Sequence, residues 1–164
     1  MRIAVISDTH IPRRARDLPR GAWDVIATCA EIIHAGDVVD RAFLERLGAA
    51  APLHVVRGNN DRSLHDLPES LTLTRGDVTI AIIHDSGPSR GRRERLRRAF
   101  STRVVVFGHS HVPVVDDDGD LLLLNPGSPT DRRSQPRFTM AVLTVANGEV
   151  DATLVDLGLE RARS

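Results

Sequence analysis

The stretch that decides the fold is Arg2-Ile3-Ala4-Val5-Ile6-Ser7-Asp8-Thr9-His10, at the start of the chain. Its apolar, β-branched run at residues 3–6 predicts a buried strand. Asp8 and His10 follow that run directly, so they stand at the carboxyl end of the expected strand. Because alternate residues of a strand point to the same face, we expect both side chains to converge on one ion.

Helices and strands alternate after this stretch. We expect a helix at residues 20–28, a strand at 31–35, a helix at 41–50 and a strand at 53–56, because Pro52 forbids the second helix from continuing. Such a β-α-β-α-β series predicts a parallel sheet covered by helices. The loops that leave the carboxyl ends of its strands are the natural place for a site.

Strands dominate the rest of the chain. They are expected at residues 71–74, 78–83 and 103–107, and then at 112–115, 121–124, 138–145 and 149–155. The sequence Asp117-Asp118-Gly119-Asp120 separates two of these runs, and Asp-Gly pairs favour hairpin turns. The second half of the chain is therefore expected to form an antiparallel sheet.

Length and composition describe one globular domain. The chain has 164 residues, no net charge and 41% hydrophobic residues, and a chain of this length buries roughly 70% of its unfolded surface. We expect a single domain at residues 1–159 and a frayed tail at residues 160–164. The N-terminal apolar run is too short for a signal peptide or a membrane span, so we expect a cytoplasmic protein without a membrane partner.

Missing residue types exclude several functions. All 22 basic residues are arginine, whereas a Walker A phosphate loop, a Schiff-base enzyme and a protein kinase each need a lysine. No two glycines stand two positions apart, so the dinucleotide fingerprint is missing too. Zero net charge and few aromatic residues argue against a broad nucleic-acid surface. A local contact with nucleic acid stays open.

Four short blocks and one further histidine follow expected strands and carry metal-ligand residue types. The blocks are Asp8-Thr9-His10, Gly36-Asp37-Val38-Val39-Asp40, Gly58-Asn59-Asn60-Asp61 and Gly108-His109-Ser110-His111, and the single residue is His84. Carboxylate, imidazole and amide ligands without a thiolate suit manganese, iron, magnesium, nickel or zinc. Four histidines, two aspartates and one asparagine make seven candidate ligands, which is more than one ion needs. Two ions roughly 3.5–4 Å apart can bind both the attacking and the leaving oxygen of a phosphoryl transfer. The pattern therefore predicts phosphoester hydrolysis.

The order of these blocks resembles the calcineurin-like metallophosphoesterases, which carry D-x-H, G-D-x-x-D, G-N-x-D, a single histidine and G-H-S-H. The later Asn125-Pro126-Gly127-Ser128 is similar to an element of the small single-domain bacterial and archaeal phosphodiesterases of that family. The resemblance spans residues 8–128. It implies an α/β fold in which a two-sheet β-sandwich is flanked by helices, in four layers ordered α/β/β/α.

The resemblance also implies a role for each matched residue. The first metal ion would be held by Asp8, His10, Asp37 and His111, and Asp37 would bridge to a second ion held by Asn59, His84 and His109. Asn59 would reach both that ion and a phosphate oxygen, so the catalytic set is Asn59, His109 and Asp37. The acidic residues Asp40 and Asp61 match positions of the motifs and are expected to orient ligands.

The expected function is that of a binuclear metal-dependent phosphodiesterase, which uses two divalent ions to hydrolyse a small phosphodiester substrate. Manganese is the favoured ion. The ions would lower the pKa of a bridging water, and the resulting hydroxide would attack phosphorus in line. Two alternatives share the fold: a protein-interaction scaffold with a degenerate metal site, and a nuclease. The complete ligand set favours the enzyme over the scaffold, and the chain lacks the length for the extra DNA-binding domain of the repair nucleases. A homo-oligomer stays open.

Two positions depart from the family pattern, and one charged run belongs to no motif. Asn60 stands where protein phosphatases of the superfamily carry a histidine that can act as general acid, so protein phosphatase activity is not expected. Asp85 stands where the small phosphodiesterases usually carry glycine, and we expect its carboxylate at the rim of the site. The arginines of residues 90–98 are interpreted as a solvated helix face, with contact to an anionic substrate or nucleic acid as the alternative.

Overall fold

The computed structural model describes residues 1–159, which contain ten strands and three helices. The elements of the first half are β1 (Arg2–Ile6), α1 (Arg20–Ile26), β2 (Glu31–His34), α2 (Arg41–Ala50), β3 (Leu53–Val55), β4 (Ser70–Arg75) and β5 (Val78–Ile83). Those of the second half are α3 (Arg92–Ala99), β6 (Val104–Val106), β7 (Val114–Asp117), β8 (Leu122–Asn125), β9 (Thr139–Ala146) and β10 (Glu149–Asp156). The expected tail at residues 160–164 lies outside the described residues.

The strands form two mixed sheets of five strands each. The first sheet has the order β10-β9-β1-β2-β3, and the second has the order β4-β5-β6-β8-β7. Strand β2 runs parallel to both β1 and β3, which confirms the parallel arrangement expected for the first third of the chain. Helices α1 and α2 cover the outer face of this sheet, where Ile26, Phe43 and Leu47 pack against Ile32.

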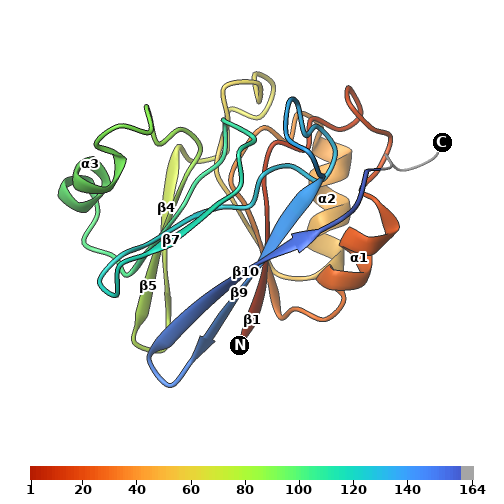
Figure 1. The fold of residues 1–164 in the computed structure, drawn as a ribbon. Coiled ribbons are helices and arrows are strands. Elements are labelled where there is room, and N and C mark those ends of the chain that lie inside the picture. Colours follow the sequence, from red (N-terminus) through yellow and green to blue (C-terminus); the bar gives the residue numbers. More distant parts are fainter. Residues whose placement is uncertain (160–164) are drawn as a thin grey trace.

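The expectation that the second half forms an antiparallel sheet is wrong. Strand β9 pairs antiparallel with β1, so the β9–β10 hairpin extends the first sheet and lies beside β1 in Figure 1. In the second sheet β6 runs parallel to both β5 and β8. Parallel neighbours need a crossover connection, and α3 supplies one between β5 and β6. The alternation of side chains shows that a segment is a strand but does not show which strand it pairs with.

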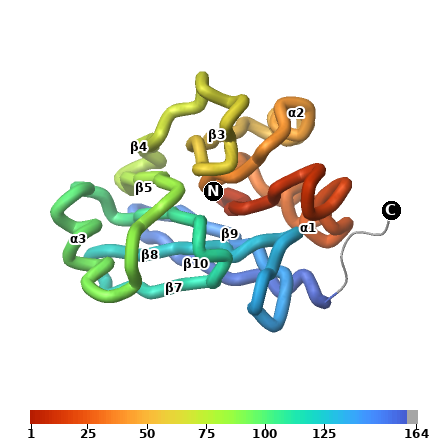
Figure 2. Tube along the Cα trace, turned by 90° about the horizontal axis from the view of Figure 1, so that it is seen from above, coloured from red at the N-terminus to blue at the C-terminus, as the bar shows by residue number. Residues whose placement is uncertain are grey.

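Helices and sheets stack in four layers, as expected. The core between the sheets contains fully buried side chains from both of them, among them Val5, Ile33, Ile82 and Val106. On the outer face of the second sheet, Leu96 of α3 packs with buried residues of that sheet. Figures 1 and 2 place α3 at one end of the molecule and α1 and α2 at the other, which is the α/β/β/α order.

Two arginines of α3, Arg93 and Arg97, contact the hairpin between β7 and β8, whereas Arg95 and Arg98 are exposed as expected for a solvated face. Arg93 contacts Asp118 at 2.9 Å and Asp116 at 2.8 Å, and Arg97 contacts Asp118 as well. The turn expected at Asp117–Asp120 is therefore present, and its aspartates fasten α3 to the second sheet. None of the three helices described in residues 1–159 is both long enough and apolar enough to cross a membrane.

Candidate metal centre

The candidate ligands lie on loops that leave the carboxyl ends of strands in both sheets. Asp8 and His10 follow β1, Asp37 follows β2, Asn59 follows β3, His84 follows β5, and His109 and His111 follow β6. Backbone hydrogen bonds tie these loops together: the Asp8 N–H donates to the Gly36 carbonyl at 3.0 Å, and the Gly108 N–H donates to the His84 carbonyl at 2.9 Å. The fold thus brings all seven residues to one end of the sandwich.

The first group of ligand atoms belongs to Asp8, His10 and His111. The Asp8 Oδ1 atom lies 3.4 Å from His111 Nε2, and the Nε2 atoms of the two histidines are 3.4 Å apart. One ligand atom of each residue lies within 4.8 Å of the others, and all three side chains are buried. These atoms can share one cation.

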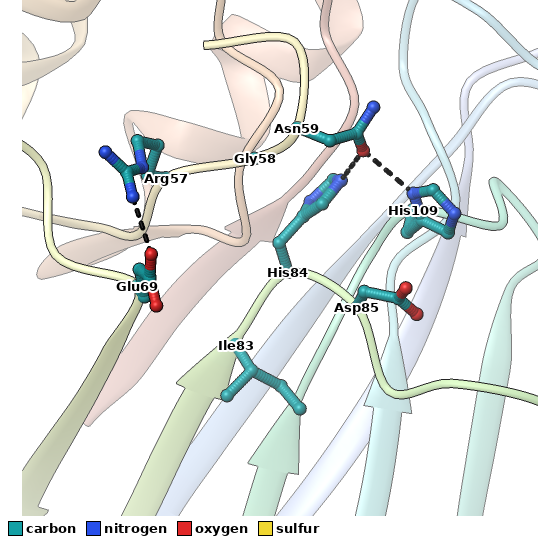
Figure 3. Close-up of a pocket in the computed structure, with 8 residues that line it drawn as sticks. All are labelled: Arg57, Gly58, Asn59, Glu69, Ile83, His84, Asp85 and His109. Atoms are coloured by element: carbon teal, nitrogen blue, oxygen red, sulfur yellow. Dashed lines mark hydrogen bonds and ion pairs between the residues drawn. The ribbon is translucent and has the colours of Figure 1, made fainter. Parts of the chain in front are cut away.

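The second group surrounds Asp37. Its Oδ2 atom lies 3.6 Å from His10 Nε2 and 3.5 Å from His84 Nε2, so it stands between the two groups. The Asn59 Oδ1 atom lies 3.1 Å from His84 Nε2 and 3.0 Å from His109 Nδ1, and Figure 3 shows these three side chains converging at the mouth of a pocket. Asp37 is therefore placed where a bridging carboxylate would stand.

The convergence of Asp8 with His10 does not come from strand alternation, and that expectation is wrong. Strand β1 ends at Ile6, and Asp8 and His10 lie beyond it with positive φ angles of 55° and 46°. His109 and His111 repeat the pattern after β6, with φ angles of 66° and 58°. Left-handed backbone is uncommon for residues other than glycine, although aspartate and histidine adopt it more often than most, and it concentrates at functional sites. Paired left-handed residues turn both members of each pair toward the centre.

Burial and charge set unusual protonation states in the first group. Burial raises the pKa of Asp8 to about 7, and this effect outweighs the opposing influence of His84 and a hydrogen bond from Ser7. Burial also lowers the pKa of His111 to about 4, so its imidazole is neutral. Because the His111 Nδ1–H donates to the Asp131 carbonyl, its Nε2 lone pair faces Asp8 Oδ1. When Asp8 is ionised, two acceptors face each other, and the pair then needs a proton or a cation between them.

In the second group, the charges of His84 and Asp37 shift the pKa values of both residues. Burial alone would lower the pKa of His84, but the hydrogen bond to Asp37 and the charges of Asp8 and Asp37 raise it to about 9. Burial likewise opposes ionisation of Asp37, yet His84 and Asn60 hold the pKa of its carboxyl far below the usual range. The His84 Nδ1–H donates to the Ala35 carbonyl at 2.7 Å, so His84 Nε2 needs a proton or a cation to face Asp37.

The residues present fit a divalent cation. The Asp8 Oδ1 atom is buried and accepts no hydrogen bond from the described residues, although an unpaired buried acceptor is costly. Its other oxygen accepts hydrogen bonds from the Ser7 hydroxyl at 2.7 Å and the His109 N–H at 2.9 Å, which aim Oδ1 inward. Carboxylate, imidazole and amide donors are those that hard to borderline divalent ions prefer.

The two further acidic residues of the motifs, Asp40 and Asp61, have different contacts. Asp61 accepts the N–H groups of Asp37 and Gly58 through Oδ2, at 2.8 and 2.7 Å, and so orients a candidate ligand as expected. Asp40 does not orient a ligand, which corrects the expectation for it. Its side chain accepts the Phe43 N–H at 3.1 Å and caps the N-terminus of α2.

Two glycines of the motifs are required by close approach and not by their backbone angles. A Cβ atom at Gly58 would lie 2.1 Å from Asp37 Oδ1 and 2.3 Å from the Asp37 backbone nitrogen. A Cβ atom at Gly108 would lie 1.9 Å from the Ser7 hydroxyl and 2.8 Å from Asp8 Oδ2. Neither has a positive φ angle. Both glycines therefore let the loops pack directly onto the carboxylates.

Sequence reasoning missed two contributors. Asn60, considered only as a missing histidine, donates its backbone N–H and its Nδ2 to Asp37 at 2.8 and 2.6 Å. Asp131 orients His111 through its backbone carbonyl, a role for which no side-chain type is needed and which leaves no signal in the sequence. The signal for Asn60 was its place beside Asn59.

Comparison with known proteins gives the family. A family model described as the calcineurin-like phosphoesterase superfamily domain matches residues 1–148, which include all seven candidate ligands. The chain belongs to this superfamily. A probable metallophosphoesterase from Methanocaldococcus jannaschii is 42% identical over 134 residues, which are 79% of this chain and 69% of the relative. Another, from Methanothermobacter thermautotrophicus, is 35% identical and covers 100% of this chain and 97% of its own length.

The superfamily fold is also seen in solved structures. Vacuolar Protein Sorting 29 from Cryptosporidium parvum superposes with a TM-score of 0.78 at 19% identity, over 96% of this chain and 98% of the other. This likeness concerns the fold alone. Membership of the phosphoesterase superfamily and the two groups of candidate ligands together indicate that the chain binds divalent metal.

Proposed function

We propose that this protein is a phosphodiesterase that uses two divalent metal ions, manganese foremost, to hydrolyse small phosphodiesters. The observation that carries the proposal is the buried Asp8 Oδ1 atom, which faces His111 without a hydrogen-bond donor. The position of Asp37 between His10 and His84 supports a second ion beside the first. In this proposal residues 1–159 form the single catalytic domain, and the cytoplasmic location expected from the sequence is kept.

The residues of the site would bind the two metal ions and one phosphate oxygen of the substrate. The first ion would be held by Asp8, His10, Asp37 and His111, and the second by Asp37, Asn59, His84 and His109. Bound ions would supply positive charge beside the phosphate and lower the pKa of water. Asn59 turns Oδ1 toward His84 and His109. Its amide nitrogen, which has no partner among the described residues, is left to donate to a phosphate oxygen.

The substrate would lie in the pocket shown in Figure 3. This pocket has a volume of about 400 Å³ and is lined on one side by Asn59, His84 and His109. At its other end Arg57 pairs with Glu69 at 2.6 Å. Asn60 stands where a general acid could stand, but its amide does not release a proton at neutral pH, and it donates hydrogen bonds to Asp37 instead. Leaving groups that need little protonation, such as aryl or nucleotide-derived ones, are therefore favoured.

The experiment is a metal analysis followed by a substrate panel. After loading with manganese and removal of free ions, we expect two ions per chain by elemental analysis. With manganese present, bis(4-nitrophenyl) phosphate should then turn over faster than 4-nitrophenyl phosphate, since a monoester carries extra charge and Arg57, which lines the pocket of Figure 3, is already paired with Glu69. One ion or none would overturn the binuclear site, and faster monoester turnover would overturn the substrate class. A protein that binds no metal and hydrolyses neither ester would instead be a scaffold.

A further inference from the structure

A smaller cavity, separate from the pocket of Figure 3, borders the first group of candidate ligands. Its volume is about 170 Å³, below the roughly 300–1,000 Å³ of pockets that hold whole drug-sized ligands. It shares no lining residue with the larger pocket, and it touches the centre through His10 and Asn60. The remaining lining residues are Arg13, Arg14, Asp131 and Arg133. A cavity of this size suits one small group of a substrate.

The charge of this cavity is positive, although the whole chain is neutral. Arg14 contacts Asp131, with its Nε atom 3.2 Å from Oδ2. Arg13 and Arg133 are exposed, and neither forms an ion pair within residues 1–159. Three guanidinium groups therefore stand against one carboxylate. Guanidinium groups bind phosphate oxygens through paired hydrogen bonds, which makes arginine the residue of choice for phosphate recognition.

The loop that carries Arg133 is the one that orients the metal centre. The Ser128 hydroxyl accepts the N–H groups of Thr130 and Asp131, and it donates to the Asp8 carbonyl at 2.8 Å. Asp131 in turn accepts the His111 Nδ1–H through its carbonyl. Arg133 follows with a φ angle of 48°, in the left-handed region. Hydrogen bonds to the segments of Asp8 and His111 therefore fix the backbone up to Asp131, two residues before Arg133.

The small cavity borders the first group of candidate ligands directly. His10 lines it together with the three arginines, and the His10 Nε2 atom lies 3.4 Å from His111 Nε2 and 3.6 Å from Asp37 Oδ2. An anion in the small cavity would thus lie beside the first group of ligands, within reach of a substrate whose reacting phosphate is at the centre.

We propose that this arginine cavity binds a second phosphate group of the substrate, so that the natural substrates are phosphodiesters that carry a further phosphate monoester. The inference rests on the proposed function and narrows its substrate class. Phenylalanine, tyrosine and tryptophan are absent from the cavity lining, whose six residues are all charged or polar, and this lining suits a phosphate group better than an apolar ring. The reacting phosphate is expected at the candidate metal ligands, and the arginines are free to bind the second phosphate group.

The test compares two aryl diesters that differ only in this group: thymidine 5′-(4-nitrophenyl phosphate) with and without a 3′-phosphate. For the wild-type protein with manganese, we expect the 3′-phosphate to lower KM about tenfold or more, as charge-assisted hydrogen bonds allow. The double variant Arg13→Gln/Arg133→Gln should lose this preference. The matched control is Arg98→Gln, an exposed arginine of α3 without an ion pair among the described residues, which should keep it. If the double variant instead lost activity equally with both diesters, the arginines would hold the reacting phosphate, and the inference would be overturned.

A binding experiment separates this inference from the proposed function. Thymidine 3′,5′-bisphosphate and thymidine 5′-phosphate are titrated into the wild type and the double variant by calorimetry, with and without manganese. Tighter binding of the bisphosphate by the wild type alone supports the cavity even if no diester is hydrolysed. Equal affinities of the two nucleotides for the wild type, or an advantage of the bisphosphate that persists in the double variant, would overturn it whatever the activity.

Discussion

Asp8 turns its Oδ1 atom toward His111 Nε2 at a distance of 3.4 Å, and this buried oxygen accepts no hydrogen bond from the described residues. The arrangement is unfavourable without a cation, which is how a metal site differs from a structural hydrogen-bond network. We therefore expect the ionised Asp8 carboxylate to lower the stability of the metal-free protein, and removal of its charge to raise that stability.

The first prediction concerns Asp8→Asn without metal. The pKa of Asp8 is raised from 3.8 to about 7 by burial, so the folded protein binds this proton more tightly than the unfolded chain does. The Asp8 contribution therefore lowers stability as pH rises from about 4 to about 7. With chelator present, we expect Tm to fall less between pH 5 and pH 8 in Asp8→Asn than in the wild type. Asp24→Asn, at an exposed helical position, is the control and should follow the wild type.

The second prediction concerns Asp37→Asn. The change removes the charge between His10 and His84, and it can set an amide N–H group against the donating Asn60 side chain. Loss of a partner outside the ligand set typically costs roughly 10–100-fold in activity. A shared ligand should cost more, so we expect diesterase activity to fall at least about 100-fold, whereas Asp8→Asn should mainly weaken one metal site. Retention of most activity in Asp37→Asn would contradict a bridging role.

The third prediction is that metal uptake increases with pH. The pKa of His84 is about 9 in the metal-free site, because Asp37 and Asp8 stabilise its charged form against the opposing effect of burial. Below that pH the metal must expel a proton from His84, and below pH 7 a second one from Asp8. We expect manganese affinity to rise about tenfold per pH unit between pH 7 and 9. Calorimetry in two buffers with different ionisation heats measures the released proton, and affinity that is independent of pH would refute this assignment.

The fourth prediction concerns the rim of the larger pocket. Asp85 is exposed, follows His84 and lines this pocket, while its Oδ1 atom accepts the Gly87 N–H at 2.7 Å. A carboxylate there repels an anionic diester. Replacement by asparagine keeps the acceptor atom and removes the charge, so Asp85→Asn should lower KM for a charged diester, more strongly at low salt. The manganese content should not change, and a large loss of metal would instead place Asp85 among the ligands.

The fifth prediction uses two glycines. In Gly58→Ala the new Cβ atom would meet the Asp37 backbone nitrogen at 2.3 Å, which no side-chain rotation can relieve. We expect a loss of about 1–3 kcal/mol in stability together with weaker metal binding. The matched control is Gly48→Ala in α2, where nothing lies within 4 Å of the new atom. It should stabilise the helix by about 0.5–1 kcal/mol. Chemical denaturation of both variants measures the change in the free energy of unfolding, which should be negative for Gly58→Ala and positive for Gly48→Ala.

Local patterns in the sequence predicted the elements and the members of the site. Helix α2 at 41–50 and strand β5 at 78–83 have the expected bounds, because apolar periodicity and Pro52 are properties of neighbouring residues. The order of the motifs likewise identified Asp8, Asp37 and His84 as candidates. Each motif follows a strand, and the ends of parallel strands meet at one edge by the geometry of the fold.

Only the tertiary structure decided how these parts combine. The pairing of β9 with β1 joins residues about 140 positions apart, and a strand's own alternation does not identify its partner. The left-handed backbone of Asp8 and His10 is held by hydrogen bonds to the loop after β2. The Asp131 carbonyl orients His111 whatever side chain residue 131 carries. Residue types thus determined which candidate ligands the chain has, whereas contacts between distant segments determined which atoms face one another.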